Sequence, residues 1–216
     1  MTMKESAAKK NILKKIKQAL AIPMPAPFAE KDDQLKIFTT PSQEPEVEFA
    51  QKFTELQGRF SFCANETELV NQLKTLFTTR EWKNIFLRED ELIQNLKTSG
   101  LNIDFSDDLE ACDAAITSCE YLVTRTGSIA LSSAQKSGRT VSVYAPVHIC
   151  VAYTSQLVYD IKDGLDLLAK KYHGKLPSLI TFATGPSRTA DIEKTLVTGV
   201  HGPKEVFCFL VEKSNT

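Results

Sequence analysis

The segment that decides how this chain folds reads TGPSRTADIE at residues 184–193, and GVHGP follows it closely at residues 199–203. An apolar run at residues 179–183 leads into the first motif, which predicts a buried strand that ends at a Gly-Pro-Ser turn. A helix is predicted after this turn, because either Gly185 or Ser187 can serve as its N-cap.

The predicted helix runs to about Val197 and ends at Gly199, since glycine adopts the left-handed conformation of a helix end at little cost. A second turn at residues 201–203 then returns the chain to a last strand at residues 205–211. The whole segment is therefore expected to form a strand, a turn and a helix, followed by another strand.

The start of such a helix is a natural site for an anion, because its first N–H groups have no partner within the helix. Arg188 adds a planar set of donors that suits a carboxylate or a phosphate, and Asp191, one helical turn later, can orient it. Hydroxyl groups come from Thr184, Ser187 and Thr189. The alternative is an ordinary capped helix, in which the acidic residues only stabilise the first turn.

Two further segments carry candidate site residues. The loop TRTGS at residues 124–128 joins two predicted strands, and its hydroxyl groups and Gly127 can surround an anion, although a polar hairpin with a bulge fits the same pattern. His148 is expected at a strand end facing a cleft, and His201 lies between two turns that contain glycine. A histidine at such a place acts either as an acid or base or as a structural donor, and both interpretations stay open.

Strands and helices alternate between residue 46 and about residue 105, which predicts parallel strands joined by crossover helices. From residue 114 several strands follow one another without helices, which indicates a β-rich insert or an antiparallel continuation of the sheet. The predicted helices are residues 46–58, 66–79, 91–98 and 159–172. The other predicted strands are residues 59–64, 84–88, 101–105, 114–117, 121–124, 129–132, 140–144 and 149–153. The predicted fold class is α/β, a mostly parallel sheet flanked by helices.

The N-terminal part of the chain reads as a separate arm. Residues 4–20 predict an amphipathic helix with Ile12, Leu13 and Ile16 along one stripe, and the first 20 residues hold six lysines and one glutamate. This basic helix is expected to dock on the protein itself or on a sister subunit, or to contact a membrane surface. Five prolines follow in residues 21–45, which is typical of a linker. We therefore predict two parts, an arm at residues 1–45 and an α/β domain at residues 46–216.

The composition argues against several functional classes. A net charge of −1 provides no global basic field for nucleic acid. No apolar run approaches the roughly eighteen residues of a membrane span, and the N-terminus lacks the apolar region of a secretory signal. The five cysteines are widely spaced and lack the spacing of zinc or iron–sulfur ligands, which favours a reducing cytoplasm. Phosphate-binding loop, zinc protease and serine hydrolase motifs are also absent from the sequence.

The motifs at residues 184–193 and 199–203, together with TGS at residues 126–128 and YAPVH at residues 144–148, resemble the lactate-utilisation protein C family, also called the LUD domain family. The resemblance covers roughly residues 46–212, and the lysine-rich N-terminal helix is also similar to that of the family. It implies a fold like that of the NagB/RpiA/CoA-transferase proteins, a parallel-rich sheet flanked by helices with an added smaller β element. The family often has an acidic residue before the TG pair, where this chain has Arg125.

The resemblance also implies a role in the oxidation of L-lactate to pyruvate, alongside two partner proteins that carry iron–sulfur clusters. We expect this chain to bind no cluster itself and to hold a small carboxylate or phosphate. The predicted ligand-binding residues are Thr126, Gly127, Ser128, Gly185, Ser187, Arg188, Thr189, Asp191, His201 and Gly202. Two alternatives are an assembly or regulatory module that holds a partner's loop, and a free-standing enzyme on sugar phosphates or acyl-CoA, the latter by analogy of fold alone.

Overall fold

The computed structural model describes residues 7–21, 43–192, 195–199 and 201–213. The chain divides into two compact units, Met1–Thr40 and Pro41–Thr216. In the first unit, the helix α1 (Ala7–Leu20) confirms the predicted basic helix, and Ile12, Leu13 and Ile16 are exposed on it. Residues 4–6 of that prediction and most of the predicted linker lie outside the described residues. No helix in the described part of the chain has the length and apolar character needed to cross a bilayer.

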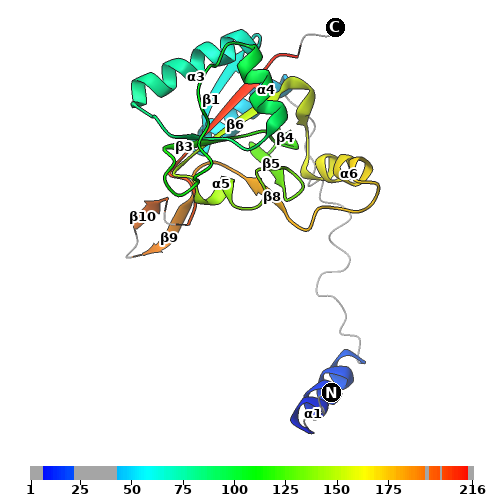
Figure 1. The fold of residues 1–216 in the computed structure, drawn as a ribbon. Coiled ribbons are helices and arrows are strands. Elements are labelled where there is room, and N and C mark those ends of the chain that lie inside the picture. The colour runs from blue at the N-terminus through cyan, green and yellow to red at the C-terminus, as the bar shows by residue number, and fades with distance from the viewer. Residues whose placement is uncertain (1–6, 22–42, 193–194, 200, 214–216) are drawn as a thin grey trace. The chain divides into compact units, whose positions relative to one another are not determined.

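Five parallel strands form the central sheet of the second unit (Figure 1). They are β1 (Arg59–Cys63), β2 (Ile85–Phe86), β3 (Ala114–Thr117), β6 (Val147–Tyr153) and β11 (Glu205–Val211). Their order is β1-β11-β6-β3-β2, and every neighbouring pair is parallel. The alternation of strands and helices therefore predicted the central sheet correctly. The predicted strand at residues 101–105 is wrong, since only Ser106 forms a bridge to Phe86, while Leu101 is buried in the core.

A second sheet of four strands is built from the middle of the chain. Its strands are β4 (Tyr121–Val123), β5 (Ser128–Ser132), β7 (Leu157–Val158) and β8 (Ile180–Ala183), in the order β7-β4-β5-β8. The β4–β5 and β5–β8 pairs are antiparallel. This sheet confirms the predicted β-rich insert, which is a separate layer and not a continuation of the first sheet. The short strand β7 carries too few residues to show a pattern in the sequence.

The helices α3 (Glu66–Arg80) and α4 (Asp90–Thr98) cover one face of the parallel sheet, and the second sheet lies on the other face together with α2 (Pro45–Glu55) (Figure 1). The helices of this unit are α2 (Pro45–Glu55), α3 (Glu66–Arg80), α4 (Asp90–Thr98), α5 (Val141–Tyr144) and α6 (Ile161–Lys171). As predicted, Asn65 caps α3, and its side chain accepts a hydrogen bond from the Glu68 backbone N–H at 2.9 Å. One hydrophobic core joins α3 and α4 to the parallel sheet, and a second lies between the sheets, where Phe49 and Phe53 of α2 are fully buried.

The predicted strand at residues 140–144 is wrong, because this segment forms the short helix α5. A strand would place Val141 and Val143 on the same face. Instead Val141 is buried in a small cluster next to Ala145, whereas Val143 is exposed. Packing of one valine into this cluster therefore overrides the β preference of a segment rich in branched side chains.

The helix predicted from residue 187 to about Val197 is also wrong. Two antiparallel strands take its place, β9 (Arg188–Ile192) and β10 (Thr195–Thr198), and they form a hairpin (Figure 1). Branched residues are frequent in this segment, and they favour an extended backbone. Gly199 does adopt the predicted left-handed conformation, with φ of 80°, but it follows a hairpin and not a helix.

Candidate functional site

The motifs at residues 144–148, 184–193 and 199–203 meet through backbone hydrogen bonds. The N–H of Ser187 donates to the carbonyl of Pro203 at 3.0 Å, and the N–H of Gly199 donates to the carbonyl of Ser187 at 3.0 Å. The N–H of Lys204 donates to the carbonyl of Pro146 at 2.8 Å. We call these five residues the motif junction. It lies where β6 and β11 begin, at the amino end of the parallel sheet.

Gly202 is needed for the tight packing of the motif junction. A Cβ atom added at Gly202 would lie 2.9 Å from the Cβ of Ser187, which is closer than real side chains approach each other. His201, next to it, is exposed to solvent. The structure therefore brings together Ser187, His201 and Gly202, three of the predicted site residues, although the described residues place no helix N-terminus there.

A row of three hydroxyl groups links the TGS loop to the first motif. The Oγ1 of Thr126 lies 2.7 Å from the Oγ of Ser128, which lies 2.9 Å from the Oγ1 of Thr184. The antiparallel pairing of β5 with β8, which places Ile129 opposite Ala183, sets these positions side by side. Two of the three hydroxyl protons are used within this hydroxyl row, so the third O–H has no acceptor among the described residues and can donate to a ligand.

The two glycines of the TGS and GPS motifs form the surface on which α2 packs. Gly127 has φ of 61°, and a Cβ atom there would lie 2.6 Å from the backbone nitrogen of Phe53. Gly185 has φ of 88°, and its Cβ atom would lie 2.5 Å from the carbonyl oxygen of Leu56. Both glycines therefore permit close approach of backbone. The backbone that approaches them belongs to the protein itself, namely the last turn of α2 and Leu56.

Arg188 contacts the same end of α2. Its Nη2 donates a hydrogen bond to the carbonyl of Leu56, the residue that follows the last turn of α2. A cation at a helix C-terminus complements the negative end of the helix dipole. A guanidinium carries five N–H donors, so the contact with Leu56 leaves donors that can bind an anion. The Arg188 side chain is exposed, as such a role requires.

Arg125, which precedes the TG pair of the TGS motif, is paired within the protein. Its Nε donates to Oδ2 of Asp160 at 2.7 Å, and its Nη2 donates to Oδ1 at 3.3 Å. Asp160 also caps α6 by accepting a hydrogen bond from the Lys162 backbone N–H. The hydrogen bond from Arg125 lowers the pKa of Asp160. The arginine therefore fixes the start of α6.

The other candidate residues lie in different environments. His148 is fully buried, which contradicts the predicted cleft, and its Nε2 lies 2.8 Å from Oγ1 of Thr117. Burial lowers the pKa of His148 to about 4, so the imidazole is neutral at pH 7. Thr189 and Asp191 lie in β9, and their side chains fall outside the described part of the structure. The helical spacing that would pair Asp191 with Arg188 is absent.

The family model described as LUD domain matches residues 4–211. This chain belongs to the LUD domain family. Its relatives include proteins named "Lactate utilization protein C" from Halalkalibacterium halodurans, at 38% identity over 104 residues, and from Geobacillus sp., at 32% identity over 139 residues. These alignments cover 47% and 63% of this chain and 45% and 56% of the relatives, so the chain matches about half the length of each.

A solved structure supports the fold of this LUD-domain protein. The crystal structure of a DUF162 family protein from Deinococcus radiodurans superposes with a TM-score of 0.60 and covers 80% of this chain and 99% of that chain. The sequence identity is 18%, so the likeness concerns the fold.

Sequence reasoning missed the partners of Arg188 and Arg125 in this LUD-domain protein. Leu56 contributes only a carbonyl group, for which the sequence holds no signal. Asp160 could have been found, because Asp160 and Asp163 have the spacing of a reciprocal N-cap. Among the described residues, no group of three or more histidine, cysteine, aspartate or glutamate side chains is placed to hold a metal ion.

Proposed function

We propose that this LUD-domain protein serves in lactate utilisation, as a component of an L-lactate oxidation system. In this proposal the protein itself carries no iron–sulfur cluster. The support is its similarity to relatives named "Lactate utilization protein C". The iron–sulfur clusters belong to partner proteins in this proposal. All five cysteines of this chain are buried, and burial raises the pKa of Cys63 to about 11, so this thiol stays protonated.

The hydroxyl row beside Arg188 carries the proposal that the protein binds a small carboxylate or phosphate. Thr184 is exposed, and it ends a row that retains one O–H donor. Arg188 follows four residues later and has donors beyond its contact with Leu56. Charged and neutral donors together are the usual means of binding a carboxylate such as lactate or pyruvate. His201 and Gly202 lie beside Ser187 and complete the site in this proposal.

Growth on lactate tests the role of the protein. A strain without the gene should fail to grow on L-lactate as carbon source and should grow normally on glucose, and the wild-type gene should restore growth on lactate. Equal growth of the deletion strain and its parent on L-lactate would contradict the proposal.

Calorimetric titration of the purified protein with L-lactate, pyruvate and inorganic phosphate tests the ligand site. We expect one of these anions to bind, and we expect Arg188→Ala and Thr184→Val to bind it at least ten times more weakly. Lys175→Ala removes an exposed cation elsewhere and should bind like the wild type. Equal affinity of the wild type and Arg188→Ala would show that the site is wrong, even if the growth experiment succeeds.

A second candidate function is an assembly module that holds a partner's loop at the motif junction. The observation that favours it is the pair of backbone hydrogen bonds that join Ser187 to Gly199 and to Pro203, on either side of the exposed His201. Anaerobic affinity purification from cells grown on lactate distinguishes the two. An iron–sulfur partner that co-purifies with wild type but not with His201→Asp, in the absence of anion binding, would favour the assembly module.

A further inference from the structure

The strand β1 lies at the edge of the parallel sheet, and its outer side has no neighbouring strand among the described residues. The carbonyl of Cys63 accepts a hydrogen bond from Glu212 at 2.8 Å, so Cys63 faces β11. Backbone groups of alternate residues in a parallel strand point to opposite sides. The N–H and C=O groups of Phe60 and Phe62 therefore point outward, and we call this side the β1 edge.

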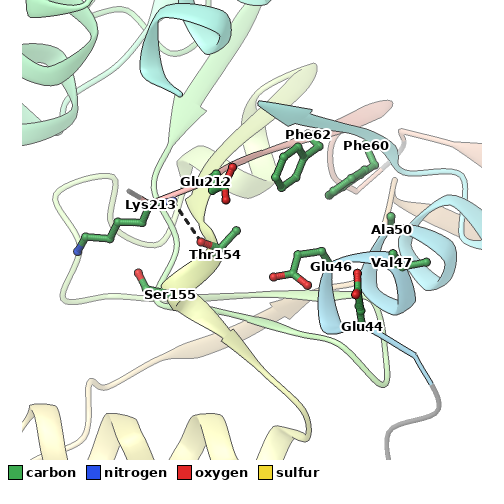
Figure 2. Close-up of a pocket in the computed structure, with 10 residues that line it drawn as sticks. All are labelled: Glu44, Glu46, Val47, Ala50, Phe60, Phe62, Thr154, Ser155, Glu212 and Lys213. Carbon is green, nitrogen blue, oxygen red and sulfur yellow. Dashed lines mark hydrogen bonds between the residues drawn. The ribbon is translucent and has the colours of Figure 1, made fainter. Parts of the chain in front are cut away.

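Cavities lie on both faces of the β1 edge. The first has a volume of about 940 Å³ and is lined by Phe60 and Phe62 together with residues of α2 (Figure 2). The second has a volume of about 720 Å³ and is lined by Ser61, by Phe207 and Phe209 of the neighbouring strand β11, and by residues of α3. Successive side chains of an added strand would point alternately to these two faces.

The β1 edge lacks the usual protection against strand addition. Its sequence, RFSFC, contains no proline and only one charged residue, Arg59, and the register with β11 runs without a bulge. Phe62 is 43% exposed. The carbonyl of Phe62 accepts a long hydrogen bond of 3.4 Å from Nε2 of Gln72, at the end of a flexible side chain that an incoming strand can displace.

Carboxylates surround the first cavity. Figure 2 shows Glu44, Glu46 and Glu212 around the space that the rings of Phe60 and Phe62 face, while the Lys213 side chain extends away from it. Within the described residues, none of these three carboxylates forms an ion pair. The surface that an added strand would meet is thus apolar at its floor and negative at its rim.

We propose that the β1 edge binds an extended segment of a partner protein, which adds as a sixth strand and carries basic residues next to apolar ones. Main-chain hydrogen bonds to Phe60 and Phe62 supply affinity, and the two cavities select alternate side chains. The carboxylate rim favours lysine or arginine on the face toward α2. The same rim disfavours a second copy of this chain, because two copies of Glu46 and Glu212 would meet at a symmetric β1–β1 contact.

Selection from a phage-displayed library of random nine-residue peptides, with the full chain as bait, tests the proposal. We expect enriched peptides with apolar residues at every second position and at least one lysine or arginine. A synthetic copy of an enriched peptide should slow amide hydrogen exchange at Phe60 and Phe62 at least tenfold. The amide of Ser61, which faces β11, should be protected with or without peptide.

Substitutions locate the binding surface. Phe62→Lys and Glu46→Lys should weaken peptide binding at least tenfold. Leu176→Lys is the matched control, because Leu176 is 49% exposed and lines neither cavity, and it should bind like the wild type. Three outcomes would overturn the proposal: enriched peptides that are acidic or lack alternation, Phe60 and Phe62 amides that already exchange slowly in the free protein, and a dimer that Phe62→Lys dissociates.

Discussion

Arg188 donates a hydrogen bond to the backbone carbonyl of Leu56, across 132 positions of the sequence. The contact ties the motif at residues 184–193 to the end of α2, and Gly185 packs against the same carbonyl. The motif therefore positions a helix of the core, in addition to binding any ligand. This double role predicts that changes in the motif affect stability as well as binding.

Replacing Arg188 by alanine should lower the free energy of unfolding by about 0.5–1 kcal/mol, because the end of α2 loses a cation and a donor. Urea unfolding followed by circular dichroism measures this change in the absence of any anion. Lys175→Ala is the control and should leave the unfolding midpoint unchanged. A midpoint of Arg188→Ala equal to that of the wild type would show that the contact with Leu56 does not stabilise α2.

Replacing Gly127 by alanine should destabilise the protein more than replacing a glycine of similar conformation elsewhere. Gly127 and Gly174 both have positive φ, at 61° and 77°, so alanine strains the backbone by roughly 1–2 kcal/mol at either position. Only at Gly127 does the new Cβ also meet backbone, that of α2, whereas nothing lies within 4 Å at Gly174. The extra overlap should add about 1–3 kcal/mol.

Thermal and urea unfolding of the two variants provide the measurement. Similar losses for Gly127→Ala and Gly174→Ala would mean that α2 moves aside easily. In that case the TGS loop would not hold α2 rigidly, and Gly127 would not be required for the packing of this helix.

The sequence predicted local features well. The N-cap of α3 and the alternation that builds the central sheet depend on neighbouring residues, such as Asn65 with Glu68, and both are confirmed. The hairpin after Ser187 was missed because Gly-Pro-Ser is an equally good start for a helix, and only the closure by Gly199 and Pro203 selects the strand form. The structure shows close backbone contacts at Gly127 and Gly185, but a sequence does not show which backbone approaches a glycine.

Buried His148 should make the stability of the protein depend on pH. Its pKa in the folded protein is about 4 and its ordinary value is 6.5, so the unfolded chain binds more protons between these values. The free energy of unfolding has its full value above about pH 6.5 and decreases as the pH falls toward 4, by up to roughly 1.4 kcal/mol per pH unit.

Urea unfolding at pH 5 and pH 7 checks this sign. The difference between the two pH values should be smaller in His148→Asn, which keeps a polar group near Thr117 but does not titrate in this range. Leu176→Asn serves as the control, because it places an amide at an exposed position that does not titrate and should leave the pH dependence unchanged. An identical pH dependence in His148→Asn and wild type would rule out His148 as its source.

The Arg125–Asp160 pair should couple the TGS loop to α6. The side chains are 31% and 11% exposed, and their hydrogen bonds of 2.7 and 3.3 Å form a two-point contact. Because Asp160 also caps α6, Arg125→Ala should lower the free energy of unfolding by about 1–3 kcal/mol. Arg125→Glu, which places a carboxylate next to that of Asp160, should lower it further by repelling Asp160. A double-mutant cycle of Arg125→Ala and Asp160→Asn measures the interaction directly, and a coupling energy near zero would mean that Arg125 does not hold the start of α6 and is available to contact a ligand or a partner.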